Sequence, residues 1–195
     1  MPAVERPLVA GGPVRRTGRH GWIGSHLRKG GETLPALWDS LAALLPPGIA
    51  LTADAAPASA AGTAAVWRVQ AANANAGHRL PTGDPERGVR ITLEAVTDAG
   101  DTIARIEHTI AQRYQWSPEV KKVSDNRLAP GDSIMLTLRY RVPREAYRLV
   151  ARAENERISD ANADYHRLPA SYTRRAEVAR VERRARPALG GTLVP

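Results

Sequence analysis

The strict alternation of apolar and polar residues in several short segments restricts the fold of this chain more than any other feature. The clearest case is residues 133–142, where a large apolar side chain occupies every second position: Ile134, Leu136, Leu138, Tyr140 and Val142. A period of two places these side chains on one face of a β-strand, whereas a helix would repeat them three or four residues apart. The segment is therefore predicted to be a strand.

Comparable segments recur along the chain and are separated by turn sequences. Asp98 to Asp101 and Ala129 to Asp132 each combine Asp with Gly, which is typical of tight turns. Several short strands joined by such turns favour a mainly β fold, an antiparallel β-sandwich of the immunoglobulin-like type. The predicted strands are residues 49–51, 64–72, 89–96, 102–111, 133–142 and 147–158.

The remaining segments suggest four regions. Residues 1–32 are rich in Gly, Pro and Arg and are predicted to be an extended arm. Residues 33–63 contain one short α-helix, Thr33 to Leu45, with an apolar stripe at helical spacing, and then a linker. Residues 64–160 form the β-sandwich domain. Residues 161–195 are predicted to be a basic C-terminal extension, in which Ser171 to Arg186 fits either a helix or a final edge strand.

Composition excludes some kinds of chemistry. The 195 residues include no cysteine, so the chain has no disulfide and no Cys-x-x-Cys-His motif for covalent haem attachment. The formal net charge of +8 would favour anionic partners. No apolar run approaches the ~20 residues of a membrane-spanning helix, and the N-terminal residues show no hydrophobic signal region.

The familiar catalytic motifs are not found in the sequence. It has no phosphate-binding Walker loop, no nucleophile elbow, no His-Glu-x-x-His pair and no dinucleotide fingerprint. Asp84 and Glu86 lie among arginines and a proline, where a solvated turn is the favoured interpretation. An enzymatic function therefore has no support in the sequence.

The histidines are the main candidates for a binding role. His78 lies in the Gly- and Pro-rich loop from Asn73 to Asp84, while His20 and His26 lie in the N-terminal arm. Neutral imidazole binds haem iron and zinc, but the spacing of these three histidines matches no recognised zinc site, so no metal site is predicted. For His78 the alternative is a structural turn residue that bonds to backbone carbonyl groups.

Two segments resemble motifs of a known family. Ala74 to Arg87, which reads Ala-Asn-Ala-Gly-His-Arg-Leu-Pro-Thr-Gly-Asp-Pro-Glu-Arg, is similar to a loop in the C-terminal β-domain of multihaem c-type cytochromes related to the cytochrome c554 group. Ser124 to Asp132, Ser-Asp-Asn-Arg-Leu-Ala-Pro-Gly-Asp, resembles the turn that precedes a long strand in the same domains. The two motifs occur in the order found in that family, and the resemblance covers Trp67 to Arg157.

The resemblance implies a β-domain from a multihaem electron-transfer protein. In those cytochromes the haem motif often continues as Met-Pro, so Met1-Pro2 looks like the two residues just after a missing haem-attachment motif, and the chain looks like a C-terminal fragment. The implied cofactor is haem c of the parent protein, with none attached to this chain. His20, His26 and His78 are then candidate axial ligands to haems on another segment or a redox partner protein, in a periplasmic or other extracytoplasmic location.

Two other classes of function remain open. The first is a stand-alone β-sandwich whose basic C-terminal segment binds an anionic partner; nucleic acid is not expected, because no RNA-binding motif or pattern of interleaved aromatic residues occurs. The second is a hydrolase or metal enzyme that uses His78, and it has the least support.

Overall fold

The structure is a computed structural model that describes residues 3–7, 9–18 and 48–188. Its strands and helix have the following bounds: β1 Ala3–Pro7, β2 Val14–Gly18, β3 Ile49–Ala53, β4 Ala64–Asn73, β5 Gly88–Thr97, β6 Thr102–Gln115, β7 Lys121–Asp125, β8 Ser133–Arg141, β9 Tyr147–Glu156, α2 Asp160–Tyr165 and β10 Arg175–Ala185.

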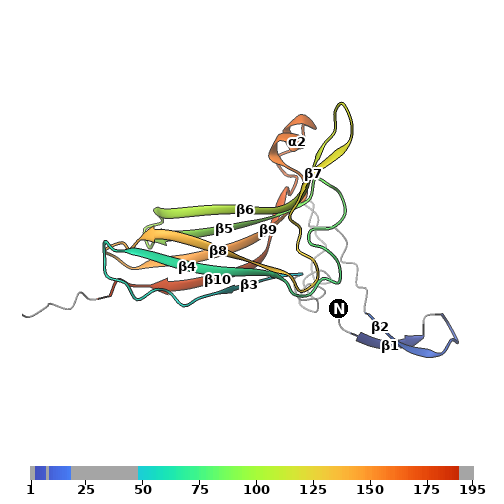
Figure 1. The fold of residues 1–195 in the computed structure, drawn as a ribbon, viewed down its shortest axis with the longest axis horizontal. Coiled ribbons are helices and arrows are strands. Elements are labelled where there is room, and N and C mark those ends of the chain that lie inside the picture. Colours follow the sequence, from blue (N-terminus) through green and yellow to red (C-terminus); the bar gives the residue numbers. More distant parts are fainter. Residues whose placement is uncertain (1–2, 8, 19–47, 189–195) are drawn as a thin grey trace, which may run out of the picture.

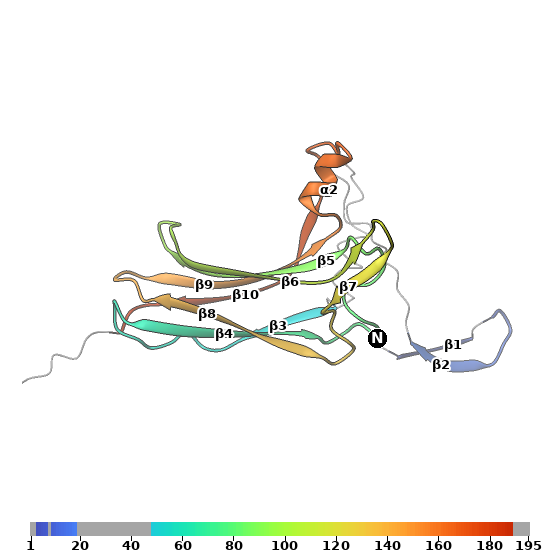
Figure 2. The ribbon, with the colours of Figure 1, turned by 45° about the horizontal axis from the view of Figure 1, so that its top comes forward.

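Two antiparallel sheets face each other (Figures 1 and 2). The larger has five strands in the order β10-β9-β5-β6-β7, and the smaller has three in the order β3-β4-β8. β1 and β2 form a separate two-stranded hairpin. The predicted mainly β fold, an antiparallel sandwich, is confirmed.

The core lies between the two sheets and is made by the alternating residues of the predicted strands. In β4, Trp67 and Val69 point inward with exposed fractions of 1% and 0%. The Trp67 indole Nε1 donates a hydrogen bond to the Asp54 carbonyl oxygen at 3.1 Å, which satisfies its one polar group. Beside Trp67 in the same sheet, Leu138 of β8 also points inward. Opposite them lie the inner residues of the larger sheet: Ile91, Leu93, Ile110 and Leu149.

The central strand β5 is buried on both faces, although its sequence alternates. Its outward residues Thr92 and Glu94 are only 2% and 8% exposed. Arg105 of β6 forms an ion pair with Glu94 at 3.2 Å, and Arg152 of β9 binds the other oxygen of that carboxylate. Long arginine side chains from both neighbouring strands therefore cover the outer face of β5.

Several elements differ from the sequence predictions. β6 continues to Gln115, beyond the predicted end at residue 111, because its last residues pair with β7, a strand that lacks apolar alternation and was not predicted. Ser171 to Arg186, left open between a helix and a strand, contains β10, which pairs with β9 along its length. The sandwich thus includes β3 and β10, which lie outside residues 64–160.

The helical prediction and the arm prediction have different outcomes. The helix expected over Thr33 to Leu45 lies outside the described residues, and the α-helix in the described part of the chain is α2. Part of the predicted extended arm forms the β1–β2 hairpin, in which Ala3 pairs with Gly18 and Pro7 with Val14. In the described segments, no helix is long and apolar enough to cross a bilayer.

Candidate functional site

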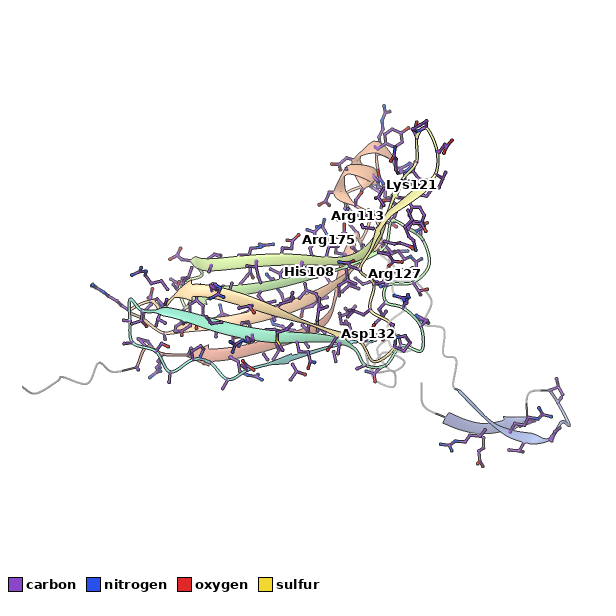
Figure 3. The ribbon with its side chains drawn as sticks, viewed as in Figure 1. His108, Arg113, Lys121, Arg127, Asp132 and Arg175 are labelled. Carbon is purple, nitrogen blue, oxygen red and sulfur yellow. The ribbon has the colours of Figure 1, made fainter. Side chains whose placement is uncertain are left out.

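The two motif segments meet at one end of the sandwich. Leu80 and Leu128 form an isolated antiparallel bridge, with reciprocal backbone hydrogen bonds of 2.9 and 3.1 Å. Nearby, the Arg79 guanidinium donates a hydrogen bond to the Arg127 carbonyl oxygen at 3.3 Å. Figure 3 shows Arg127 and Asp132 at this end, near the base of the β6–β7 hairpin. Two loops that are far apart in the sequence therefore form one surface.

Asn73, the last residue of β4, ties the two loops together. Its side-chain Nδ2 donates to the carbonyl oxygens of His78 at 2.8 Å and Leu128 at 3.0 Å, while its Oδ1 accepts from the Ala76 amide at 3.2 Å. Its backbone amide donates to the Asp132 carbonyl, and its own carbonyl accepts from the Gly131 amide, both at 2.9 Å. Asn73 is 1% exposed, so every polar group of this buried residue is satisfied.

The second loop is held by its own polar residues. The side-chain amide of Asn126 forms hydrogen bonds to the backbone of β6, as the backbone of a neighbouring strand would. Its Oδ1 accepts from the Ala111 amide at 2.8 Å, and its Nδ2 donates to the Thr109 carbonyl at 2.9 Å. The Asp125 carboxylate accepts hydrogen bonds from Arg127 Nε and Nη2, both at 2.8 Å. The hydrogen bonds from Arg127 hold the pKa of Asp125 well below its usual range, and the same contact raises the pKa of Arg127.

Gly131 allows the turn after Leu128 to bring its backbone against the end of β4. It adopts a φ of +84°, which favours glycine, and its amide reaches the Asn73 carbonyl. The Asp132 amide donates to the Ala129 carbonyl at 2.9 Å, and the Asp132 carboxylate accepts from the Ala129 amide at 3.1 Å. The predicted turn is therefore present and leads directly into β8.

His78 is exposed on the surface made by the two loops. Its ring Nδ1 lies 3.1 Å from the Arg79 carbonyl oxygen. A carbonyl oxygen only accepts hydrogen bonds, so Nδ1 carries the proton and Nε2 of the neutral ring keeps its lone pair. The carbonyl group of His78 is held by Asn73, which fixes the backbone beneath the ring. This arrangement can present Nε2 to an electrophile such as a metal ion.

The other candidate histidines are placed elsewhere or lie outside the described residues. His20 and His26 belong to the segment that the structure does not describe. His108 lies in β6 with the inward parity of Ile110 and is half-buried, and His166 is exposed at the C-terminal end of α2, edge-on to Tyr165. Within residues 3–7, 9–18 and 48–188, no group of three or more His, Asp or Glu side chains could hold a metal ion.

Three of the six arginines from Ser171 to Arg186 form ion pairs within the fold. Arg174 forms ion pairs with Asp160 and Asp164 at 3.4 and 3.0 Å, and Arg175 pairs with Asp160 and, at 3.6 Å, with Glu156. Arg180 pairs with Glu177 and Glu182 at 3.4 and 3.1 Å. Arg183, Arg184 and Arg186 form no ion pair with a described residue, so half of the arginines of this segment are compensated and the hypothesis of an anion-binding module is only partly weakened.

Both loops were selected from the sequence, but no role was assigned to Asn73 or Asn126, which hold them. Asn73 stands where the strand pattern of residues 64–72 stops, and a polar amide at such a place is a signal that could have identified it. Asn126 follows β7, which has no strand pattern, so its role had no such signal. The pairing of Asp125 with Arg127 also follows a local pattern, because the two side chains are two residues apart at the end of β7.

Comparison with known proteins gives one informative likeness. No protein-family model and no curated protein matches the chain. Among solved structures, the penta-haem cytochrome c552 from Thermochromatium tepidum superimposes with a TM-score of 0.56 at 18% sequence identity. The match covers 74% of this chain and 41% of the cytochrome, so the chain spans about two fifths of that protein's length. At this identity the likeness shows a shared fold.

Other solved structures match less closely. A glycosyl hydrolase family 2 member from Bacteroides cellulosilyticus has a TM-score of 0.36 at 17% identity, over 70% of this chain and 14% of that chain. The PapD-like domain 7 of human CEP192 has a TM-score of 0.33 at 13% identity, over 87% and 97% of the two chains. These scores are too low to support an argument about function.

Proposed function

We propose that this chain is the β-sandwich part of a multihaem cytochrome c-like electron-transfer protein and that it packs against haems and donates axial histidine ligands. The observation that carries the proposal is the position of His78. It is exposed on the joined loops, its Nδ1 is hydrogen-bonded to the Arg79 carbonyl oxygen, and the lone pair of its Nε2 is available. Ligating histidines are commonly oriented through such a hydrogen bond from the second ring nitrogen.

The haem itself would come from elsewhere. The chain has no cysteine, so the iron and its proximal ligand would belong to a haem-bearing segment or a redox partner protein, and His78 would occupy the sixth coordination position. A bis-histidine iron would transfer electrons without binding substrate. The likeness in fold to a penta-haem cytochrome supports this proposal. An extracytoplasmic location is part of the same proposal. His20 and His26 remain predicted ligands of the same kind.

A haem c peptide tests the proposal. Such a peptide carries covalent haem on Cys-x-x-Cys-His and leaves the sixth position open. We expect the full chain to convert the ferric peptide to a low-spin six-coordinate spectrum, and we expect His78→Ala to abolish most of the conversion. His166→Ala removes another exposed histidine and should behave like the unmodified chain.

Other results would change or overturn the assignment. Conversion that persists in His78→Ala but disappears in His20→Ala or His26→Ala would move ligation to the N-terminal arm. A complete lack of conversion by the intact chain would contradict the proposal.

A further inference from the structure

The β6–β7 hairpin carries a group of exposed apolar side chains at the same end of the sandwich as the joined loops (Figures 1 and 3). Trp116, Val120 and Val123 are 56%, 67% and 56% exposed. All five residues of β7 are exposed, and β7 is the last strand of its sheet. Exposed apolar residues scattered singly are ordinary, but a group on one hairpin indicates a contact surface.

A hollow lies beside this hairpin. The register between β6 and β7 shifts between Arg113 and Tyr114, and such a bulge re-aims neighbouring side chains. Both residues line the hollow together with Trp116, and Glu86 and Asn162 line it from the loop after His78 and from α2. Its volume is about 170 Å³. Sites that enclose a drug-sized molecule measure roughly 300–1,000 Å³, so this hollow holds only one edge of a larger ligand.

The aromatic side chains offer a flat apolar surface. The rings of Tyr114 and Trp116 are stacked, with centroids 5.4 Å apart and an interplanar angle of 25°. Because more than half of Trp116 is exposed, its indole can stack on a further planar ring.

Among the charges of the hairpin that have no ion pair with a described residue, Arg113 and Lys121 outnumber Glu119, and this excess favours an anionic group. Arg113 and Lys121 make no ion pair with any described residue, and Figure 3 shows both on this hairpin. Of the two carboxylates at the hollow, Glu156 is neutralised by Arg90 at 3.0 Å, while Glu86 accepts a hydrogen bond from Asn162. Arg113 is therefore the cation available to a ligand carboxylate, and Glu86 opposes it.

We infer that the hollow seats the carboxylate edge of a haem porphyrin, with Trp116 stacked on the macrocycle and Arg113 paired with a propionate. A porphyrin matches the surface because it is flat, apolar on its faces and anionic at one edge. The inference rests on the proposed function and names the surface that meets the haem. It does not require that His78 ligate the iron of the same ring.

Metal-free protoporphyrin IX is the probe, because without iron it reports on stacking and charge alone. It is titrated into the full chain and followed by fluorescence polarisation. We expect Trp116→Ala to weaken binding about five- to tenfold and Arg113→Ala about two- to fivefold. We expect Glu86→Gln to strengthen binding about twofold, because it removes the opposing charge.

Matched controls come from the other sheet. Met135 is 57% exposed, and Arg139 is also exposed; both lie in β8. Met135→Ala and Arg139→Ala should leave the affinity unchanged. Thermal unfolding of each variant checks that the fold is retained. We expect this because Trp116, Arg113, Met135 and Arg139 are exposed, and because Gln at the half-buried position 86 can still accept the hydrogen bond from Asn162.

The results separate this inference from the proposed function. His78→Ala should bind metal-free porphyrin as the intact chain does, while it loses low-spin conversion of the haem c peptide. No porphyrin binding by the intact chain, or equal binding by Trp116→Ala, would overturn the porphyrin seat even if His78 proved to be a ligand. Normal porphyrin binding without any spectral conversion would leave the seat standing and overturn the ligation.

Discussion

Asn73 determines the shape of the candidate site although it is buried beneath it. Its side chain donates hydrogen bonds to carbonyl groups of both motif loops. Its backbone forms hydrogen bonds with Gly131 and Asp132 in the turn before β8. An amide is required here because it can donate two hydrogen bonds and accept another at one position. The exposed His78 therefore depends on a residue that cannot itself contact a ligand.

Asn73→Ala tests this dependence. The substitution leaves the His78 carbonyl without its donor and the Ala76 amide without its acceptor, and it removes one of the two donors to the Leu128 carbonyl. We therefore expect the free energy of unfolding to fall by about 2–3 kcal/mol in urea denaturation. Gln70→Ala removes an exposed amide from the same strand and should change it by less than about 0.5 kcal/mol. Equal losses in the two variants would show that Asn73 has no special role.

Asp125 gives a prediction about pH. Its pKa is lowered in the folded chain by the hydrogen bonds from Arg127, so the ion pair stabilises the fold above about pH 4 and this contribution is lost as the pH falls further. At pH 7 we expect Asp125→Asn to be less stable than the unmodified chain by about 1 kcal/mol, because the pair is partly exposed. Between pH 4 and pH 2 the difference should shrink, because the unfolded chain takes up a proton at Asp125 before the folded chain does.

Unfolding in urea at several pH values measures this effect. Asp98→Asn, in the turn at the opposite end of β5, serves as the control and should show little difference at any pH. A constant difference between Asp125→Asn and the unmodified chain from pH 7 to pH 2 would contradict the assignment of the stabilisation to the ionised carboxylate.

At the scale of the elements, the strands with an apolar inner face were predictable. Residues 64–72 and 133–142 alternate cleanly, and β4 and β8 follow those segments closely. β7 was not predictable in this way, because Lys-Lys-Val-Ser-Asp buries nothing and forms a strand only by pairing with the end of β6. β10 has the pattern of a charged segment. Its Arg175 and Arg180 form ion pairs with acidic residues of β10 itself, β9 and α2, and its Glu182 also pairs with Arg148 of β9.

The candidate site was likewise predictable only in part from the sequence. Sequence reasoning selected both motifs and His78 because glycine, proline and histidine form a distinctive local pattern. It could not show that the motifs touch, because Leu80 and Leu128 meet only after β4, β5 and β6 are arranged in two sheets. The hollow beside Trp116 was missed for the same reason, since its walls come from β6, the loop after His78 and α2.

At the scale of the whole molecule, the sandwich has two dissimilar ends (Figure 2). One end carries the joined motif loops, the β6–β7 hairpin and α2. The other end carries the turn at residues 98–101, in which the Gly100 amide donates to the Thr97 carbonyl at 3.0 Å. A domain that covers haems through its loops should meet them at the first end and leave the second exposed to solvent.

Amide hydrogen exchange of the full chain, alone and saturated with the haem c peptide, tests this account most directly. We predict slower exchange at residues 74–87, 112–116 and 125–132 in the complex, and unchanged exchange at residues 98–101. His78→Ala should lose the protection at residues 74–87, because its bond to the iron is absent. Protection confined to the opposite end, or none under saturating peptide, would contradict the assignment of the loop end as the haem-facing surface.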